Sequence, residues 1–69
     1  MNIGQAIRSR REALGWTQAE LGERANVSQP MIAQIERGSK SPTIQLAQEV
    51  AAALDCTLQD LFSSGQQTA

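Results

Sequence analysis

Histidine and tyrosine are absent from this sequence of 69 residues, and Cys56 is its only cysteine. A disulfide within the chain is therefore excluded, and the usual general bases and zinc ligands are missing. A chain of this length forms one domain with a small core, so a large catalytic cleft is not expected. We predict that the protein is not an enzyme and that it uses neither a metal nor another cofactor. Cys56 is interpreted as a small apolar residue of the core.

Long apolar runs are also missing. No run reaches the roughly 20 residues that cross a membrane. Residues 1–11 do not contain the apolar segment of a signal peptide. The sequence therefore predicts a soluble, cytoplasmic protein that makes no contact with a membrane.

Positive charge is scarce overall, because the formal net charge is -1 and the pI is about 5.1. This balance is unfavourable for a nucleic-acid partner, which usually selects a basic protein. However, all six basic residues lie in the first 40 positions together with four acidic ones, whereas the remaining positions hold three acidic residues and no basic one. One positively charged face is therefore compatible with an acidic protein.

Apolar spacing and capping residues predict an all-α fold. The expected helices span approximately residues 3–14, 17–25, 29–37, 44–54 and 58–62. The residues expected to cap their N-termini are Asn2, Thr17, Ser28, Thr43 and Thr57. Those expected to face the core in the first and fourth helices are Ile3, Ile7, Leu14, Ile44, Ala47, Val50, Ala51 and Leu54. Residues 1–62 should form the domain, and residues 63–69 a flexible tail with nothing to bury.

The segment 17–38 contains two short helical patterns joined by about three residues. So tight a connection is typical of a helix-turn-helix, in which one helix braces the next at a fixed angle. Gly22 should allow the two backbones to approach closely, and Gly15, Asn26 and Gly38 suit the left-handed conformation that ends a helix. Pro30 is compatible with the first turn of a helix. The residues expected to fill the crossing are Leu21, Ala25, Val27, Ile32 and Ile35.

The opposite face of the second helix of this motif is polar and contains no acidic residue. Its members are Gln29, Pro30, Ala33, Gln34 and Arg37. A glutamine amide can pair with both groups on an adenine edge in the major groove, and an arginine can reach a phosphate. Double-stranded DNA is therefore the expected partner, although glutamines on an arbitrary helix are usually ordinary surface residues.

Across residues 3–62 the chain resembles the phage repressor/Cro-type (XRE) helix-turn-helix family. The resemblance rests on Ile7 and Arg11, on LGWTQAEL at 14–21, on SQPMIAQIERG at 28–38, and on PTIQLAQEVAAALDCTLQDLF at 42–62. These motifs are individually common, but here they occur at the family's spacing across five helices. The resemblance implies a compact five-helix bundle of the lambda repressor-like class, with residues 28–38 as the recognition helix and its stop.

The resemblance also implies a role for individual residues in binding DNA. Base contacts are expected from Gln29 and Gln34, while Pro30 and Ala33 would pack against thymine methyl groups. The residues expected to contact phosphate or to orient the others are Gln18, Ser28, Arg37 and Lys40. Gln18 and Gln29 match positions that in related repressors meet each other and the DNA. The chain departs from the family's pattern at four positions, because a glycine is usual at Asn26, an alanine at Gly22, and hydrogen-bonding side chains at Pro30 and Ala33.

Other residues are expected to have structural roles. Arg11 and Glu36 match a pair that links the first helix to the end of the third, and we expect a partly buried ion pair rather than two solvated charges. Trp16 is interpreted as a packing residue rather than a base-stacking one. Leu58, Leu61 and Phe62 leave two interpretations open, because they could complete the core of a monomer or extend it across the two-fold axis of a homodimer.

The sequence therefore predicts a sequence-specific, double-stranded DNA-binding transcriptional regulator. We expect a repressor or controller that acts as a homodimer on an inverted repeat, whose half-sites would lie about 34–36 Å apart. No small-molecule ligand is expected. The alternative is a protein-interaction module, an antitoxin or an adaptor, that uses the same fold.

Overall fold

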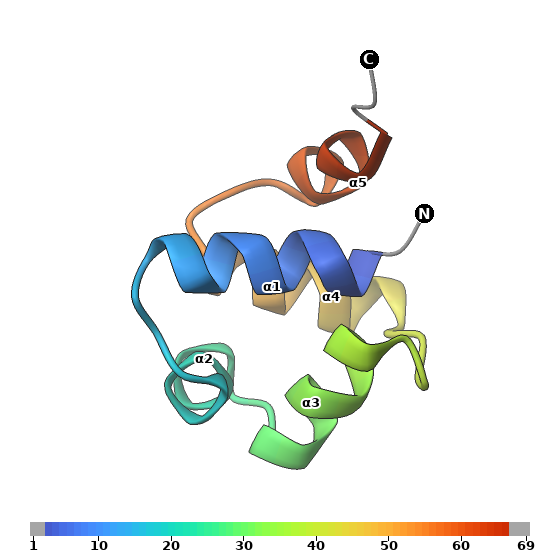
Figure 1. Ribbon diagram of the computed structural model, residues 1–69. Coiled ribbons are helices and arrows are strands. Elements are labelled where there is room, and N and C mark those ends of the chain that lie inside the picture. The colour runs from blue at the N-terminus through green and yellow to red at the C-terminus, as the bar shows by residue number, and fades with distance from the viewer. Residues whose placement is uncertain (1–2, 67–69) are drawn as a thin grey trace.

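The computed structural model describes residues 3–66, with the side chains of residues 3–62. Within this range the chain forms five helices and no strand: α1 (Ile3–Ala13), α2 (Gln18–Ala25), α3 (Gln29–Arg37), α4 (Ile44–Ala53) and α5 (Leu58–Gln66). Figure 1 shows α1 running across the middle of the molecule, with α2 and α3 on one side, α5 on the other and α4 behind. Among the described residues, no helix combines the length and the hydropathy that a membrane span requires.

The expected capping residues begin and end these helices. Thr17 and Glu20 form a capping box, in which the Glu20 backbone N–H donates to Thr17 Oγ1 (3.1 Å) and the Thr17 backbone N–H donates to Glu20 Oε1 (2.8 Å). Gly15 and Gly38 adopt φ angles of +75° and +83°, which end the preceding helices. These predictions are confirmed, whereas the expected cap Asn2 lies outside the described residues.

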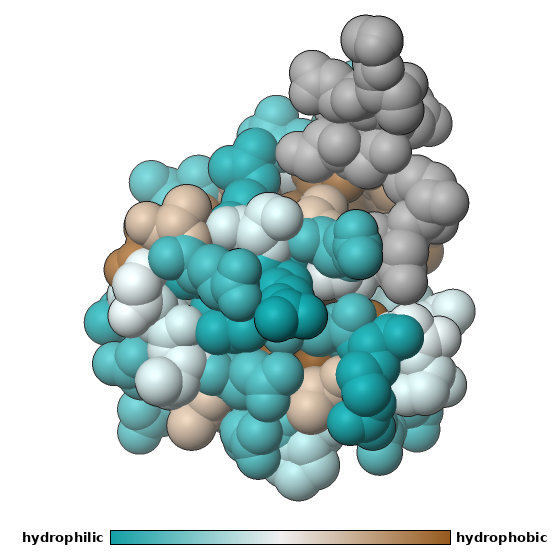
Figure 2. Space-filling view, viewed as in Figure 1, coloured by the Kyte–Doolittle hydropathy of each residue, from teal (hydrophilic) through white to brown (hydrophobic). Residues whose placement is uncertain are grey.

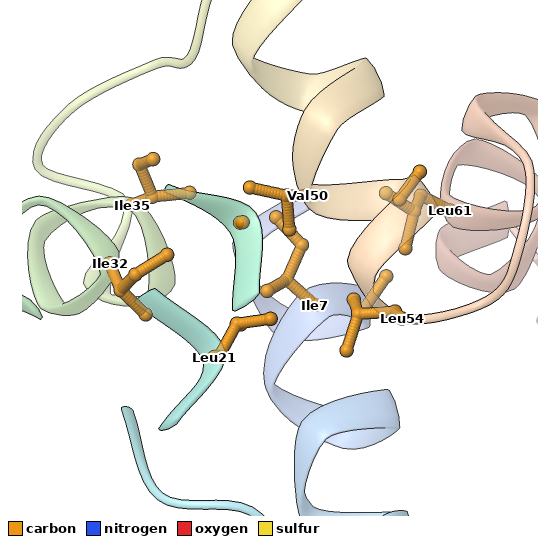
Figure 3. Packing of buried hydrophobic residues seen from close by; sticks show 10 residues of the cluster. Ile7, Leu21, Ile32, Ile35, Val50, Leu54 and Leu61 are labelled. Carbon is orange, nitrogen blue, oxygen red and sulfur yellow. The ribbon is translucent and has the colours of Figure 1, made fainter. Parts of the chain in front are cut away.

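The core is a cluster of apolar side chains to which all five helices contribute. Figure 3 shows Ile7 at its centre, between residues of α2 and α3 on one side and of α4 and α5 on the other. Full burial of one such side chain stabilises the fold by about 1.5–3 kcal/mol. The largest fully buried side chains are Ile7, Leu21, Ile32, Ile35, Val50 and Leu61.

Two residues expected in the core are instead exposed. Leu14 is 45% exposed because it follows the last residue of α1, where the chain turns through Gly15 and helical spacing no longer sets its direction. Ile44 is 66% exposed because, as the first residue of α4, it lines an open apolar groove with Pro42 and Phe62. The other four residues predicted to face the core from the fourth helix are buried.

The helix at the C-terminal end is longer than expected. α5 extends to Gln66 rather than ending at Phe62, so helix covers the first four positions of the segment interpreted as a tail. The three terminal positions, 67–69, lie outside the described residues. The difference arises because serine, glycine and glutamine offer little signal for where a helix ends once its apolar positions stop.

Candidate nucleic-acid interface

Helices α2 and α3 are joined by a turn that leaves no room for a side chain on Gly22. A Cβ atom at this position would lie 2.5 Å from the carbonyl oxygen of Val27. The Val27 backbone N–H donates to the Gly22 carbonyl oxygen at 2.8 Å, and Asn26 ends α2 with a φ of +62°. Ser28 then caps α3 by accepting from the Met31 backbone N–H at 3.4 Å. This turn fixes how α3 emerges from the body of the protein.

The two sides of α3 differ in burial. Ile32, Ile35 and Glu36 are buried, which anchors one side of the helix in the core. Gln29, Pro30 and Arg37 are exposed on the other side, with Ala33 and Gln34 half-buried beside them. The five residues expected on the outer face are thus together on it. The molecular surface over α2 and α3 is largely hydrophilic in the view of Figure 2.

Arg11 and Glu36 form the expected ion pair, which joins α1 to α3. Arg11 Nε donates to Glu36 Oε2 at 2.7 Å, and Arg11 Nη2 donates to Glu36 Oε1 at 3.0 Å. Only 9% of Arg11 and 7% of Glu36 is exposed. The hydrogen bond to Glu36 raises the pKa of Arg11 above its ordinary value. Arg11 Nη1 also donates to the carbonyl oxygen of Trp16 at 2.8 Å, so the guanidinium ties three segments together.

The ion pair continues into a chain of side-chain hydrogen bonds that reaches the surface of α3. Gln18 Nε2 donates to Glu36 Oε1 at 3.1 Å. Gln29 Nε2 in turn donates to Gln18 Oε1 at 2.9 Å. Gln18 and Gln29, the first residues of α2 and α3, are therefore in direct contact, as the resemblance implied. The contact between Gln18 and Glu36 was not predicted, because a glutamine at the start of a capped helix gives no sign of a partner 18 positions away.

The residues expected to contact phosphate differ in how exposed they are. Arg37 is exposed in the last turn of α3, and Lys40 is exposed in the loop before α4. Ser28 is exposed at the start of α3, although its hydroxyl already accepts from Met31. Gln18 is half-buried, and both ends of its amide are hydrogen-bonded within the protein. Its backbone N–H lies at the N-terminus of α2, where a helix favours an anion.

Trp16 and Cys56 both pack against the core. The Arg24 guanidinium lies 4.3 Å from the centre of the Trp16 ring, so the ring is covered on that side by a cation–π contact. Burial raises the pKa of the Cys56 thiol above its ordinary value. Among the described residues, no group of three or more His, Cys, Asp or Glu side chains is placed to hold a metal ion.

The three candidate dimer residues on α5 have different surroundings. Leu61 is fully buried in the monomer core, so it is not available to a second subunit. Leu58 is half-buried against the core, and Phe62 is 48% exposed. Leu58 and Phe62 line the same apolar groove as Ile44. Leu61 therefore completes the monomer, while Phe62 remains exposed on the surface.

Sequence reasoning also missed Gly4 on α1. A Cβ atom there would overlap the carbonyl oxygen of Ile35, so the absent side chain lets α1 lie directly against the end of α3. A glycine inside a predicted helix costs up to about 1 kcal/mol relative to alanine, and this cost is the signal that could have revealed a close contact.

The chain matches known proteins in both sequence and structure. Residues 7–61 match the helix-turn-helix family HTH_3. The HTH-type transcriptional regulator SinR of Bacillus subtilis is 34% identical over 67 residues, which cover 96% of this chain and 60% of SinR. The chain thus spans less than two thirds of the length of that relative.

Two solved structures show the same arrangement of helices. The DNA-binding domain of the P22 c2 repressor has a TM-score of 0.89 at 30% identity, with 100% of this chain and 91% of that chain covered. The master regulator for biofilm formation SinR, solved in complex with DNA, has a TM-score of 0.82 at 36% identity, with 87% of this chain and 97% of that chain covered.

Proposed function

Because the chain belongs to the helix-turn-helix family HTH_3, we propose that it is a sequence-specific regulator of transcription that binds double-stranded DNA. The observation that carries this proposal is the polar, acid-free outer face of α3, held at a fixed angle by Gly22 and by the bond between Gln29 and Gln18. The regulator acts as a repressor or controller rather than as an enzyme. We place it in the cytoplasm, where the DNA of a bacterium such as Bacillus subtilis, the source of its relative SinR, lies.

In this proposal α3 enters the major groove. Gln29 and Gln34 hydrogen-bond to base edges, and Pro30 and Ala33 pack against thymine methyl groups. The groups that contact phosphate from either side are Gln18, Ser28, Arg37 and Lys40. Phosphate contacts position the helix, while contacts from its outer face select the sequence. The acidic residues after position 40 lie on α4, on α5 and between these two helices, outside the helix-turn-helix.

The regulator binds as a homodimer on an inverted repeat. A single nine-residue recognition helix offers few base contacts, and a second subunit doubles them. A two-fold dimer would place two recognition helices in successive major grooves, about 34–36 Å apart on one face of DNA. The exposed Phe62 and the neighbouring Leu58 supply the apolar contact between subunits, without Leu61.

A protein-interaction module is the second candidate. The apolar groove that Ile44 and Phe62 line favours this alternative, because exposed apolar side chains also suit the surface of a protein partner. The salt dependence of the binding affinity distinguishes the two functions. Each phosphate contact releases counterions on binding, whereas an apolar contact does not.

The proposed function is tested by titrating labelled genomic DNA fragments with the protein across a range of salt concentrations. Between about 50 and 200 mM salt, a protein that contacts several phosphates loses affinity steeply. The matched control is the double variant Arg37→Ala/Lys40→Ala, whose log–log slope should be shallower by about two. Binding that is absent at low salt, or that does not respond to salt, would contradict the proposal.

A further inference from the structure

The hydrogen-bonded chain from Arg11 to Gln29 has a chemically fixed direction, because Glu36 can only accept. A carboxylate has no N–H or O–H group to donate, whereas a guanidinium can only donate. Glu36 Oε2 and Oε1 accept from Arg11 Nε and Nη2 at 2.7 and 3.0 Å. Glu36 is therefore an acceptor toward Gln18, whatever lies at the exposed end of these hydrogen bonds.

Gln18 connects Glu36 to Gln29, the first residue of α3, and its orientation is set by Glu36. Its NH₂ group must face Glu36 Oε1, at 3.1 Å, since the opposite orientation would bring two acceptors together. Its oxygen then faces Gln29, whose Nε2 donates to it at 2.9 Å. Chemistry thus selects one of the two amide orientations, although the two ends of an amide have nearly the same shape.

Gln29 is consequently left with one N–H and its Oε1 atom for other partners. In the major groove adenine presents one acceptor, N7, and one donor, the N6 amino group, while guanine presents two acceptors, N7 and O6. An amide with one free N–H and one free oxygen forms two hydrogen bonds with adenine. It forms only one with guanine, where the amide oxygen would face a second acceptor.

We infer that Glu36, acting through Gln18, is a positioning residue that makes Gln29 prefer adenine over guanine. This inference rests on the proposed function, because it requires Gln29 to face the bases. Glu36 is 7% exposed, so it sets the base preference without itself touching DNA. The ion pair therefore joins α1 to α3, and it also fixes the carboxylate that orients the amides of Gln18 and Gln29.

The informative variant is Glu36→Gln, which replaces the carboxylate with an amide of almost the same shape. Arg11 donates to both oxygens of Glu36, so either orientation of the new amide places its NH₂ group against one Arg11 donor. Position 36 would then no longer fix the orientation of Gln18, which could donate to Gln29 as well as accept from it. When Gln18 donates, Gln29 accepts with its oxygen and offers two N–H groups to the groove, which is the pattern that guanine requires.

Two further variants separate the direction of the chain from the stability of the fold. Arg11→Lys weakens the ion pair, yet it keeps a cation opposite a carboxylate at position 36 and so preserves the direction. Gln18→Leu interrupts the chain at its middle, yet it leaves both hydrogen bonds between Arg11 and Glu36 in place. Arg11→Lys should therefore lower the stability of the fold and keep the preference for adenine. Gln18→Leu should lose the preference for adenine and keep the stability of the fold.

The experiment compares two duplexes that differ only by an A·T or a G·C pair at the position where Gln29→Ala relaxes base choice. The readout is the ratio of their dissociation constants, measured by fluorescence anisotropy at one salt concentration and at a temperature where circular dichroism shows each variant folded. The wild type and Arg11→Lys should prefer adenine by roughly 5- to 150-fold, the range of one bidentate pair. Glu36→Gln and Gln18→Leu should each lose at least about fivefold of that preference.

Each outcome decides the inference. If Gln18→Leu and folded Glu36→Gln both kept the wild-type ratio of dissociation constants, the inference would be overturned, whereas the proposed function would stand. If Glu36→Gln does not fold, the result for Gln18→Leu decides alone. The inference would also be overturned if Arg11→Lys lost as much preference for adenine as Gln18→Leu. The ratio of dissociation constants would then depend on the stability of the fold rather than on the direction of the hydrogen bonds. A wild-type protein with no base preference at any position would overturn the inference and the proposed reading of bases together.

Discussion

The Nε atom of Arg11 lies 2.7 Å from the Oε2 atom of Glu36, although 25 positions separate the two residues in the sequence. Both side chains are largely withdrawn from water, and the pair joins the first helix to the end of the third. A buried charge without a partner is costly, whereas a buried pair that keeps its hydrogen bonds is tolerated. The placement of α3 against the body of the protein therefore depends on this contact.

Removing one member of this pair should destabilise the protein strongly. Glu36→Ala leaves the Arg11 charge buried without its carboxylate, which typically costs on the order of 3–5 kcal/mol. The control is Arg8→Ala, which removes an exposed ion pair with Glu12 and should cost less than about 1 kcal/mol. Urea unfolding followed by circular dichroism measures both. Equal effects in the two variants would mean that the buried pair contributes no more than a surface one.

Gly22→Ala should destabilise the fold even though alanine is the better helix former. The added methyl group would lie 2.5 Å from the Val27 carbonyl oxygen, so the turn between α2 and α3 would have to shift. Overpacking of this kind typically costs about 1–3 kcal/mol. Ser9→Ala, at an exposed position of α1, is the control and should be nearly neutral. Thermal unfolding that is unchanged in Gly22→Ala would contradict the close approach.

The Asp60 carboxylate should contribute to stability above about pH 4 and lose that contribution in acid. The Thr57 backbone N–H donates to Asp60 Oδ2 at 3.0 Å, and this hydrogen bond lowers the pKa of Asp60. A pKa that is lower in the folded state means that the stabilisation is complete above the unfolded value and disappears as pH falls through the folded one. In urea unfolding, wild type should be more stable than Asp60→Asn near neutrality. The difference should disappear at low pH, and a constant difference would contradict the capping role.

Two substitutions on α3 should affect DNA binding in different ways. Gln29→Ala should cost roughly 1–3 kcal/mol at one base position and relax the choice there. Arg37→Ala should weaken binding to all sequences alike and lower the salt slope by about one. Anisotropy titrations on a set of single-base variants of the best site measure both effects. If the two variants lost equal affinity on every duplex, the division between base and phosphate contacts would be wrong.

Phe62→Asp should abolish the proposed homodimer without unfolding the monomer. Phe62 is 48% exposed, so an acidic side chain here would face the partner subunit rather than the core. Gln59→Asp adds the same charge at another exposed position of α5 and is the matched control. Sedimentation at high micromolar concentration should show dimers for wild type and the control, and monomers for Phe62→Asp. A wild type that is monomeric both alone and on operator DNA would contradict the dimer.

Local signals in the sequence predicted much of the fold. Thr17 with Glu20, Ser28 before Pro30, and Gly38 each act on their own or neighbouring backbone groups, so they could be interpreted without knowledge of distant residues. The bounds of α3 follow from such signals. Ile44 was placed wrongly because helical spacing assigns a face but does not tell whether another element covers it.

The candidate site was only partly predictable, because local sequence signals do not tell how distant helices meet in space. The residues on the outer face of α3 follow from their spacing alone, and the contacts of Gln18 with Gln29 and of Arg11 with Glu36 were expected from the family resemblance. The bond from Gln18 to Glu36 joins these two pairs into one chain, and it depends on how α2 meets α3 in space. The same is true of Gly4, whose role appears only once α1 lies against Ile35.

Selection from a library of random duplexes at about 100 mM salt, followed by sequencing of the bound DNA, tests the proposed function most directly. The account predicts an enriched inverted repeat whose half-sites are about one helical turn apart, and an adenine at a position where Gln29→Ala no longer discriminates. Failure of the folded protein to enrich any sequence would contradict the account and favour a protein partner at the groove beside Phe62 and Ile44.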